Sequence, residues 1–241
     1  FYFMHIPKTA GTSLARVIEK QFEASEILPN RARMDAEFEG HYPSTVRMSN
    51  AFSVSDFANC RLLRGHFPLA ARTEFAQPPV VLTMLRDPFA RGLSQLRHMT
   101  REQSRTVDEL ACDQLISRSF VRDFQLKLFV LNPESCAQNG ELFEISTHAK
   151  LTRADLERGQ QLLSEIEWFG IQERFDDSIR LLCHRFGWPE PTSNPQLNRA
   201  KKEEPLADET RRKLESLVEL DREFYAFACE EFDRRFRAAF G

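Results

Sequence analysis

The sequence predicts an α/β fold in which a central parallel sheet lies between two layers of helices. Short apolar segments alternate along the chain with amphipathic segments of helical period, which is typical of such sheets. The segment 79–85 is a continuous apolar run, which indicates a strand that is buried on both faces. A length of 241 residues suits one full-sized core, so we expect a single domain over residues 1–241.

The first predicted unit is a strand over residues 1–6, a tight loop, and a helix over residues 12–22. Pro7 stops the strand, and the helix carries apolar residues at helical spacing. Residues 29–58 are polar and weakly periodic, so we expect irregular surface structure or a lid there, with short helical pieces. Residues 60–64 form the second predicted strand.

The strong strand 79–85 leads directly into a helix. Asp87 is a good N-cap and Pro88 is a good first helical residue, so we expect this helix to run to about Met99. Two further helices are expected around residues 106–131.

The last third of the chain continues the alternation of helices and strands. Thr152 and Asp155 have the spacing of a capping box and predict the start of a helix. The remaining predicted elements are a helix over 153–166, a strand over 167–172, a helix over 176–186, a loop over 189–205 and a last helix over 207–239.

Charge and composition exclude several classes of protein. The chain has 33 Lys and Arg against 36 Asp and Glu, and this net charge of −3 argues against a nucleic-acid partner. No apolar run reaches the length of a membrane span. Five scattered cysteines without a CxxC pair favour reduced thiols in the cytoplasm over disulfides or a zinc site. The histidines have no ligand-like spacing, so we expect no metal site.

The segment His5–Leu14, HIPKTAGTSL, has the composition of a phosphate-binding loop. A loop between a strand and a helix offers backbone N–H groups and the helix dipole to an anion. Lys8 precedes the glycine, whereas a nucleoside-triphosphate loop reads GxxxxGK[ST], so an ordinary ATPase or kinase is disfavoured. A polar turn with a helix cap is the structural alternative. The candidate anion-binding residues are Lys8, Thr9, Ala10, Gly11, Thr12 and Ser13.

The segment Leu85–Ser94, LRDPFARGLS, places basic and hydroxyl side chains around the next strand–helix turn. Arg86 ends the strand, and Ser94 lies two turns into the helix, on the same face as Arg91. A guanidinium group and a hydroxyl that converge on one point suit a phosphate. The alternative is that Arg86 pairs with a surface carboxylate and Ser94 is solvated.

His66 follows the second predicted strand in the segment LRGHF. A neutral imidazole can accept a proton from an attacking hydroxyl near pH 7, although a lone histidine is more often structural. Lys8, His66 and Arg86 each follow a different predicted strand. Ligands bind beyond the carboxyl ends of parallel strands, so we expect these three residues to share one site.

Both motifs resemble those of a known enzyme family. HIPKTAGTSL resembles the 5′-phosphosulfate loop of the sulfotransferases that include the heparan-sulfate and uronyl 2-O-sulfotransferases and many bacterial relatives. RDPFARGLS resembles the 3′-phosphate motif of the same family, in which an arginine and a serine are eight residues apart, as Arg86 and Ser94 are. A Gly-His step after the corresponding strand carries the catalytic base of the 2-O-sulfotransferases, and His66 matches it. Arg64 stands where some of those enzymes have another histidine, which puts uronyl 2-O specificity in doubt.

The resemblance implies a P-loop-like sulfotransferase fold and a sulfuryl transfer from 3′-phosphoadenosine-5′-phosphosulfate to an acceptor hydroxyl. The acceptor is expected to be a glycan or a glycosylated metabolite, and the released product adenosine 3′,5′-bisphosphate. Lys8 would neutralise charge on the departing oxygen, His66 would act as the base, and Arg86 and Ser94 would hold the 3′-phosphate. A bacterial, cytoplasmic protein is expected, or one of the Golgi lumen if an N-terminal anchor was removed.

Two further segments match the family less closely. A late basic loop covers the nucleotide in these enzymes, which makes Arg199 and Lys201 candidate contacts, although a solvated charge run is the alternative. Phe169–Ser178 resembles a family segment with an architectural role, so we do not expect Glu173 to be catalytic.

Two other functions remain open at this stage. The first is a nucleotide kinase-like phosphotransferase on a related fold, which ATP turnover would reveal. The second is a non-catalytic module that binds the nucleotide or a glycan, which binding without transfer would reveal.

Overall fold

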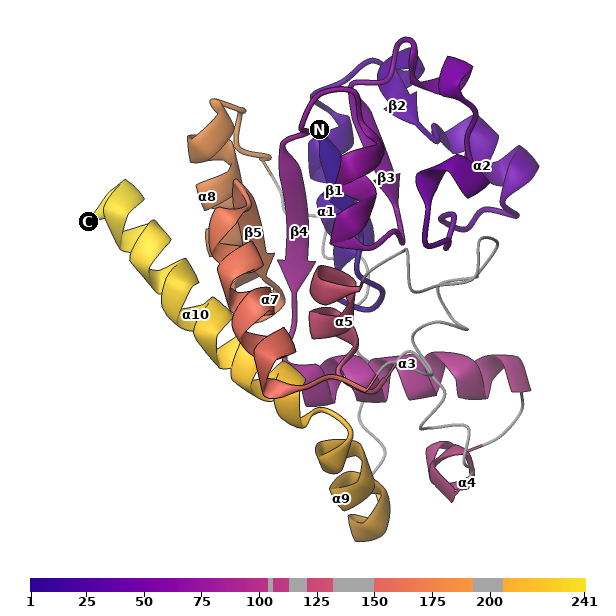
Figure 1. Cartoon of the computed structure of the whole chain (residues 1–241), viewed down its shortest axis with the longest axis vertical. Helices are drawn as coiled ribbons and strands as arrows, with labels where there is room; N and C mark the ends of the chain where they lie inside the picture. Colours follow the sequence, from indigo (N-terminus) through magenta and orange to yellow (C-terminus); the bar gives the residue numbers. More distant parts are fainter. Residues whose placement is uncertain (104–105, 113–120, 132–149, 193–205) are drawn as a thin grey trace.

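A computed structural model describes residues 1–103, 106–112, 121–131, 150–192 and 206–241. Figure 1 shows a central sheet with helices packed on both sides and with helix α3 crossing below the carboxyl end of β4. This arrangement confirms the predicted α/β fold with a parallel sheet flanked by helices.

The sheet has five strands in the order β2-β3-β1-β4-β5, and every neighbouring pair is parallel. β1 lies at the centre, with Met4 opposite Gly65 on one side and Thr83 on the other. The carboxyl ends of β3, β1 and β4 therefore lie side by side at one edge. The strands are β1 (Tyr2–Met4), β2 (Ile27–Leu28), β3 (Leu62–Gly65), β4 (Val81–Leu85) and β5 (Trp168–Ile171).

Helices connect the strands and form the outer layers. The α-helices are α1 (Gly11–Glu19), α2 (Arg31–Glu37), α3 (Pro88–Gln103), α4 (Val107–Cys112), α5 (Phe124–Val130), α7 (Arg153–Glu165), α8 (Phe175–Phe186), α9 (Asp208–Ser216) and α10 (Glu219–Phe240). Short 3-10 helices are η1 (Ala24–Glu26), η2 (Met48–Asn50), η3 (Val54–Phe57), η4 (Leu69–Glu74) and η7 (Gln172–Arg174). Among the helices of these described ranges, none is both long and apolar enough to cross a membrane.

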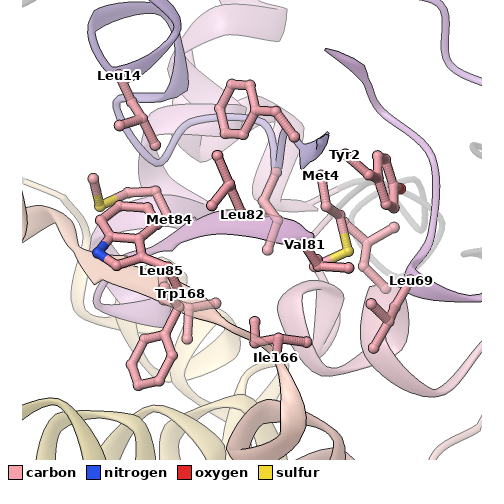
Figure 2. Close-up of a cluster of buried hydrophobic side chains, with 14 of the residues drawn as sticks. Tyr2, Met4, Leu14, Leu69, Val81, Leu82, Met84, Leu85, Ile166 and Trp168 are labelled. Carbon is pink, nitrogen blue, oxygen red and sulfur yellow. The ribbon is translucent and has the colours of Figure 1, made fainter. Parts of the chain in front are cut away.

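The main core lies between the sheet and its helices. All five residues of β4 are buried, as the continuous apolar run predicted. Figure 2 shows Leu14 of α1 on one side of β4 and Leu69 and Ile166 on the other, so helices cover both faces of the strand. Met84 of β4 and Trp168 of the neighbouring strand β5 belong to the same cluster. A smaller buried cluster joins α3 to α9 and consists of Leu93, Leu96, Val121, Leu214, Leu217 and Val218.

Two caps follow the sequence prediction closely. Asp87 accepts a hydrogen bond from the Ala90 N–H at 2.8 Å, and α3 begins at Pro88. Thr152 and Asp155 form a reciprocal capping box at the start of α7. Both predictions depend on residues within one turn of each other, which the sequence displays directly.

The prediction of surface structure over residues 29–58 is wrong in part. The short helix α2 agrees with the helical pieces expected there, but Val46, Met48 and Phe52 are buried in the main core. These apolar residues are irregularly spaced, because the chain between them bends through short 3-10 turns rather than one regular helix. Periodicity therefore gave no signal for their burial.

The single last helix predicted over 207–239 is also wrong, because the structure breaks it into α9 and α10. The break falls at Leu217, whose carbonyl accepts the N–H of Asp123 at 3.0 Å. Val218 next to it has a φ of −125°, outside the helical range, and both residues are buried. Contacts with a segment far away in the sequence thus outweigh the helical pattern of this region.

Candidate active site

Three strand ends bring the predicted site residues together. His66 follows β3, and its Nδ1 lies 2.6 Å from the carbonyl oxygen of His5, which follows β1. Arg86 follows β4, and its guanidinium donates a hydrogen bond of 3.1 Å to the carbonyl oxygen of Lys8. The structure therefore places Lys8, His66 and Arg86 at one edge of the sheet, as their positions after parallel strands predicted.

The loop after β1 has an unusual backbone. Lys8 has a φ of 69° and Ala10 a φ of 60°, so two non-glycine residues adopt the left-handed conformation. Each such residue costs about 1–2 kcal/mol, which the surrounding structure must offset. Turns that contain left-handed residues gather successive backbone N–H groups into a concave anion site, and α1 begins directly after this turn. A backbone of this shape at the start of a helix can accommodate an anionic group.

The three hydroxyl-bearing residues of this loop differ in burial. Thr9 is fully buried, and its hydroxyl donates to the Ile6 carbonyl at 2.8 Å. Ser13 is also buried, whereas Thr12 is exposed. Of the candidate anion-binding residues, Thr9 therefore has only its backbone N–H to offer an anion, because its hydroxyl already donates to Ile6.

Gly11 has a steric role that its motif did not reveal. A Cβ added at this residue would lie 1.9 Å from Cδ2 and 2.0 Å from Nε2 of the His5 ring. The first turn of α1 can start where it does only because position 11 has no side chain. The absence of a side chain at Gly11 thus lets the loop after β1 pack against the His5 ring. It also leaves the backbone of the loop accessible.

The protonation state of His66 follows from its partner. A backbone carbonyl can only accept a hydrogen bond, so Nδ1 of His66 carries the proton and Nε2 has the free lone pair. Burial lowers the pKa of His66 to about 4, and the positive charge of Lys8 acts in the same direction. The imidazole is therefore neutral at pH 7 and can accept a proton at Nε2.

Two aromatic side chains, His5 and Tyr42, pack against His66, and neither was a candidate site residue in the sequence. The His5 ring lies 4.7 Å from the His66 ring and 4.5 Å from the Tyr42 ring, centroid to centroid. Tyr42 also contacts His66 at 5.4 Å. The His66 backbone N–H donates to Pro43 at 2.9 Å, which fixes the segment beside the imidazole. His5 begins the segment HIPKTAGTSL, but its contact with His66 depends on a residue 61 positions away. Tyr42 lies in a segment without a motif.

Arg64 is a structural residue in this fold. Its side chain is buried, forms an ion pair with Glu19 of α1, and donates to the carbonyl of Pro29 at 2.9 Å. Its guanidinium also lies 5.5 Å from the centre of the Tyr42 ring. Arg64 therefore joins α1, the turn before α2 and the wall of the site.

In the second motif, Arg86 lies at the site and Arg91 lies in the core. Arg91 is fully buried, stacks 4.8 Å from the centre of the Phe124 ring, and donates to the Pro7 carbonyl at 3.4 Å. Burial lowers its pKa to about 10, so it keeps its charge at pH 7. The prediction that Arg91 and Ser94 present one phosphate-binding face is wrong for Arg91. Its buried side chain instead contacts the loop after β1 through the Pro7 carbonyl. Ser94 stays partly exposed on α3.

The turn between β4 and α3 is held from two other elements. Gln125 of α5 forms hydrogen bonds with both the N–H and the C=O of Arg86. Glu173 accepts the Asp87 N–H at 3.1 Å and the Tyr225 hydroxyl at 2.6 Å. Glu173 thus has the architectural position that its segment suggested.

Other features lie outside this site. Arg199 and Lys201 fall within 193–205, outside the described residues. A cavity of about 440 Å³ opens before β2 and β3, at the opposite end of the sheet, and is lined by Ser25, Glu26, Ala58, Asn59, Cys60 and Arg61. In the part of the chain that the structure describes, no group of three His, Cys, Asp or Glu side chains could hold a metal ion.

The fold and the site define a class of protein: a parallel α/β protein with a left-handed turn that leads into a helix after its first strand, and with a neutral histidine beside this turn. Such a site can hold an anionic group and take a proton from a nucleophile that attacks it. The sequence matches the family described as "Sulfotransferase family" over residues 1–228. The chain therefore belongs to the sulfotransferase family and is a sulfuryl transferase. The comparison with curated proteins gives no match.

Proposed function

We propose that the protein transfers the sulfuryl group of 3′-phosphoadenosine-5′-phosphosulfate to a hydroxyl group of a carbohydrate acceptor. Family membership supports sulfuryl transfer. The observation that carries the finer proposal is the meeting of the strained Lys8–Ala10 loop, the Arg86 guanidinium and the neutral His66 at one edge of the sheet.

The donor would bind across the ends of β1 and β4. In this proposal the backbone N–H groups from Thr9 to Thr12, at the N-terminus of α1, hold the 5′-phosphate, since the Ser13 N–H already donates to the Ala10 carbonyl at 3.0 Å. Arg86 and Ser94 hold the 3′-phosphate, and Arg199 and Lys201 cover the nucleotide. The hydrogen bond from Arg86 to the Lys8 carbonyl supports the proposal, because it links the two phosphate-binding elements directly.

The proposed reaction is an in-line displacement at sulfur. The acceptor oxygen forms a bond to sulfur while the bond from sulfur to the bridging oxygen of the 5′-phosphate breaks. Nε2 of His66 takes the proton of the acceptor hydroxyl, and adenosine 3′,5′-bisphosphate leaves with the bonding electron pair. The Lys8 ammonium group neutralises the charge that develops on the bridging oxygen.

The low pKa of free His66 fits this role once the donor is bound. An anionic donor next to the imidazole favours its protonated form and raises its pKa towards neutrality. Proton transfer is most efficient when the pKa of the base lies near the working pH. The site would thus hold a neutral base before the donor binds and a stronger base afterwards.

Calorimetry with nucleotides tests the donor site. We expect adenosine 3′,5′-bisphosphate to bind at least about tenfold more tightly than AMP, because charge-assisted hydrogen bonds to the 3′-phosphate contribute about 1.5–3 kcal/mol. Equal affinities would contradict the donor assignment. Tight binding and turnover of ATP would instead indicate a kinase-like phosphotransferase.

A further inference from the structure

We propose that Gln125 is a positioning residue that fixes Arg86 for recognition of the donor's 3′-phosphate. The inference rests on the proposed function, in which Arg86 contacts that phosphate. Gln125 itself is fully buried, so it cannot touch the nucleotide and must act through Arg86.

The side-chain amide of Gln125 pairs with one peptide unit from both sides. Its Oε1 accepts the Arg86 N–H at 2.9 Å, and its Nε2 donates to the Arg86 carbonyl at 2.8 Å. An N–H can only donate and a carbonyl can only accept, so these partners also fix the orientation of the amide. In an antiparallel sheet, a hydrogen-bonded pair of residues exchanges the same two bonds.

Arg86 needs such a partner because the sheet ends before it. The last residue pair between β4 and β5 joins Leu85 to Ile171, and the pairing of β4 with β1 ends at Thr83. Beyond these pairs, Gln125 takes the place of a neighbouring strand for the backbone of Arg86. The backbone of Arg86 is thereby fixed although it lies outside the sheet.

Gln125 is in turn held by α10. The carboxylate of Asp221 accepts the backbone N–H of Gln125 at 3.1 Å and that of Leu126 at 2.7 Å. Asp123 accepts the N–H of Asp221 at 3.0 Å, so the first turns of α5 and α10 cap each other. Because the backbone of Gln125 is held by Asp221 and its side chain is buried, the Gln125 amide is restricted to a single position.

The position of Arg86 matters for both halves of the donor. Its guanidinium donates to the Lys8 carbonyl at 3.1 Å, so a shift of Arg86 changes the spacing between the two phosphate-binding elements. The affinity for a nucleotide with two phosphates depends on this spacing, because both phosphates must be bound at once. The affinity for a nucleotide with one phosphate does not depend on it. Loss of the Gln125 contacts should therefore reduce selectivity for the bisphosphate more than it reduces binding of AMP.

The experiment compares Gln125→Glu and Gln125→Met with the wild type. An ionised Glu is nearly the same size but has no donor for the Arg86 carbonyl, and Met has similar length but no strong hydrogen-bonding group, so Met removes both bonds whatever the charge of Glu. Gln161→Met on the exposed face of α7 is the matched control. Calorimetry gives the affinity of each protein for adenosine 3′,5′-bisphosphate and for AMP, and circular dichroism gives each melting temperature.

We expect both Gln125 variants to lose at least about tenfold of the preference for the bisphosphate, the equivalent of one hydrogen bond to a charged group. AMP affinity should change little, and Gln161→Met should behave as the wild type. A lower melting temperature with the preference intact in either folded variant would overturn the inference and leave the proposed function standing. A wild type without any preference would overturn the proposed function, and the inference with it.

Discussion

At the scale of single residues, the state of His66 decides how the site can act. Its Nδ1 proton is committed to the His5 carbonyl, which leaves Nε2 as the basic atom. Burial and the nearby Lys8 both disfavour the imidazolium form. The sequence placed His66 after a strand but held no information on this tautomer, which depends on a carbonyl 61 residues away.

The pH dependence of the reaction should report this environment. The profile of kcat/KM for the donor reflects the enzyme before the donor binds, in which the pKa of His66 is about 4. As pH falls through this value the base becomes protonated, so we expect kcat/KM to stay level between pH 7 and 5 and to fall near pH 4. A steady-state profile with any accepted acceptor measures this, and a fall centred near 6.5 would contradict the assigned environment.

Gly11 gives a second prediction at this scale. Gly11→Ala would place a Cβ 1.9 Å from the His5 ring, and overpacking of this kind costs about 1–3 kcal/mol. We expect a lower free energy of unfolding and weaker binding of adenosine 3′,5′-bisphosphate, measured by denaturation and calorimetry.

A double-mutant cycle provides the control. His5→Ala removes the ring that the new methyl group meets, so the two substitutions together should destabilise the protein by less than the sum of their separate effects. Strict additivity would show that the His5 ring is not what requires a glycine at position 11.

At the scale of elements, Asp123 and Asp221 join the first turns of α5 and α10, and α5 carries the Gln125 side chain that contacts Arg86. Burial raises the pKa of Asp221 to about 7, and the Asp123 carboxylate nearby is the second cause. The unfolded value is near 4, so between about pH 4 and 7 the folded state keeps a proton that the unfolded state releases. The contribution of Asp221 to the free energy of unfolding must therefore fall as pH rises through this range.

Asp221→Asn removes this titration and tests the sign. We expect the free energy of unfolding of the wild type, minus that of the variant, to decrease as pH rises from about 4 to about 7. Urea denaturation at several pH values measures both proteins. His5 and His66 titrate in both and cancel in the difference, whereas Asp123 is coupled to Asp221, so the difference reports the titration of this pair. A difference that rises with pH would show that Asp221 is ionised in the fold throughout this range.

The elements also show which structural features the sequence could predict. The start of α3 at Pro88 and the capping box at Thr152 depend on neighbouring residues, and both were predicted. The break at Leu217 was not, because it depends on a hydrogen bond from Asp123. The burial of Met48 and Phe52 was missed for a similar reason, since both pack into the core without a regular period.

At the scale of the whole molecule, parallel topology explains why much of the site could be predicted. Strand ends that are far apart in sequence meet at one edge, so Lys8, His66 and Arg86 could be grouped before the structure was known. The residues that hold these three in place could not be predicted. Gln125 lies 39 residues from Arg86 in sequence, and Asp221 lies 96 residues from Gln125, with no motif that links them.

Sulfuryl transfer itself is the most direct test of the whole account. The measurement is transfer of labelled sulfate from 3′-phosphoadenosine-5′-phosphosulfate to a panel of carbohydrate acceptors, by the wild type, Lys8→Ala and His66→Ala. We expect the wild type to label at least one acceptor and each variant to be slower by about 10²–10⁴-fold. Turnover that both variants retain nearly in full would contradict the account.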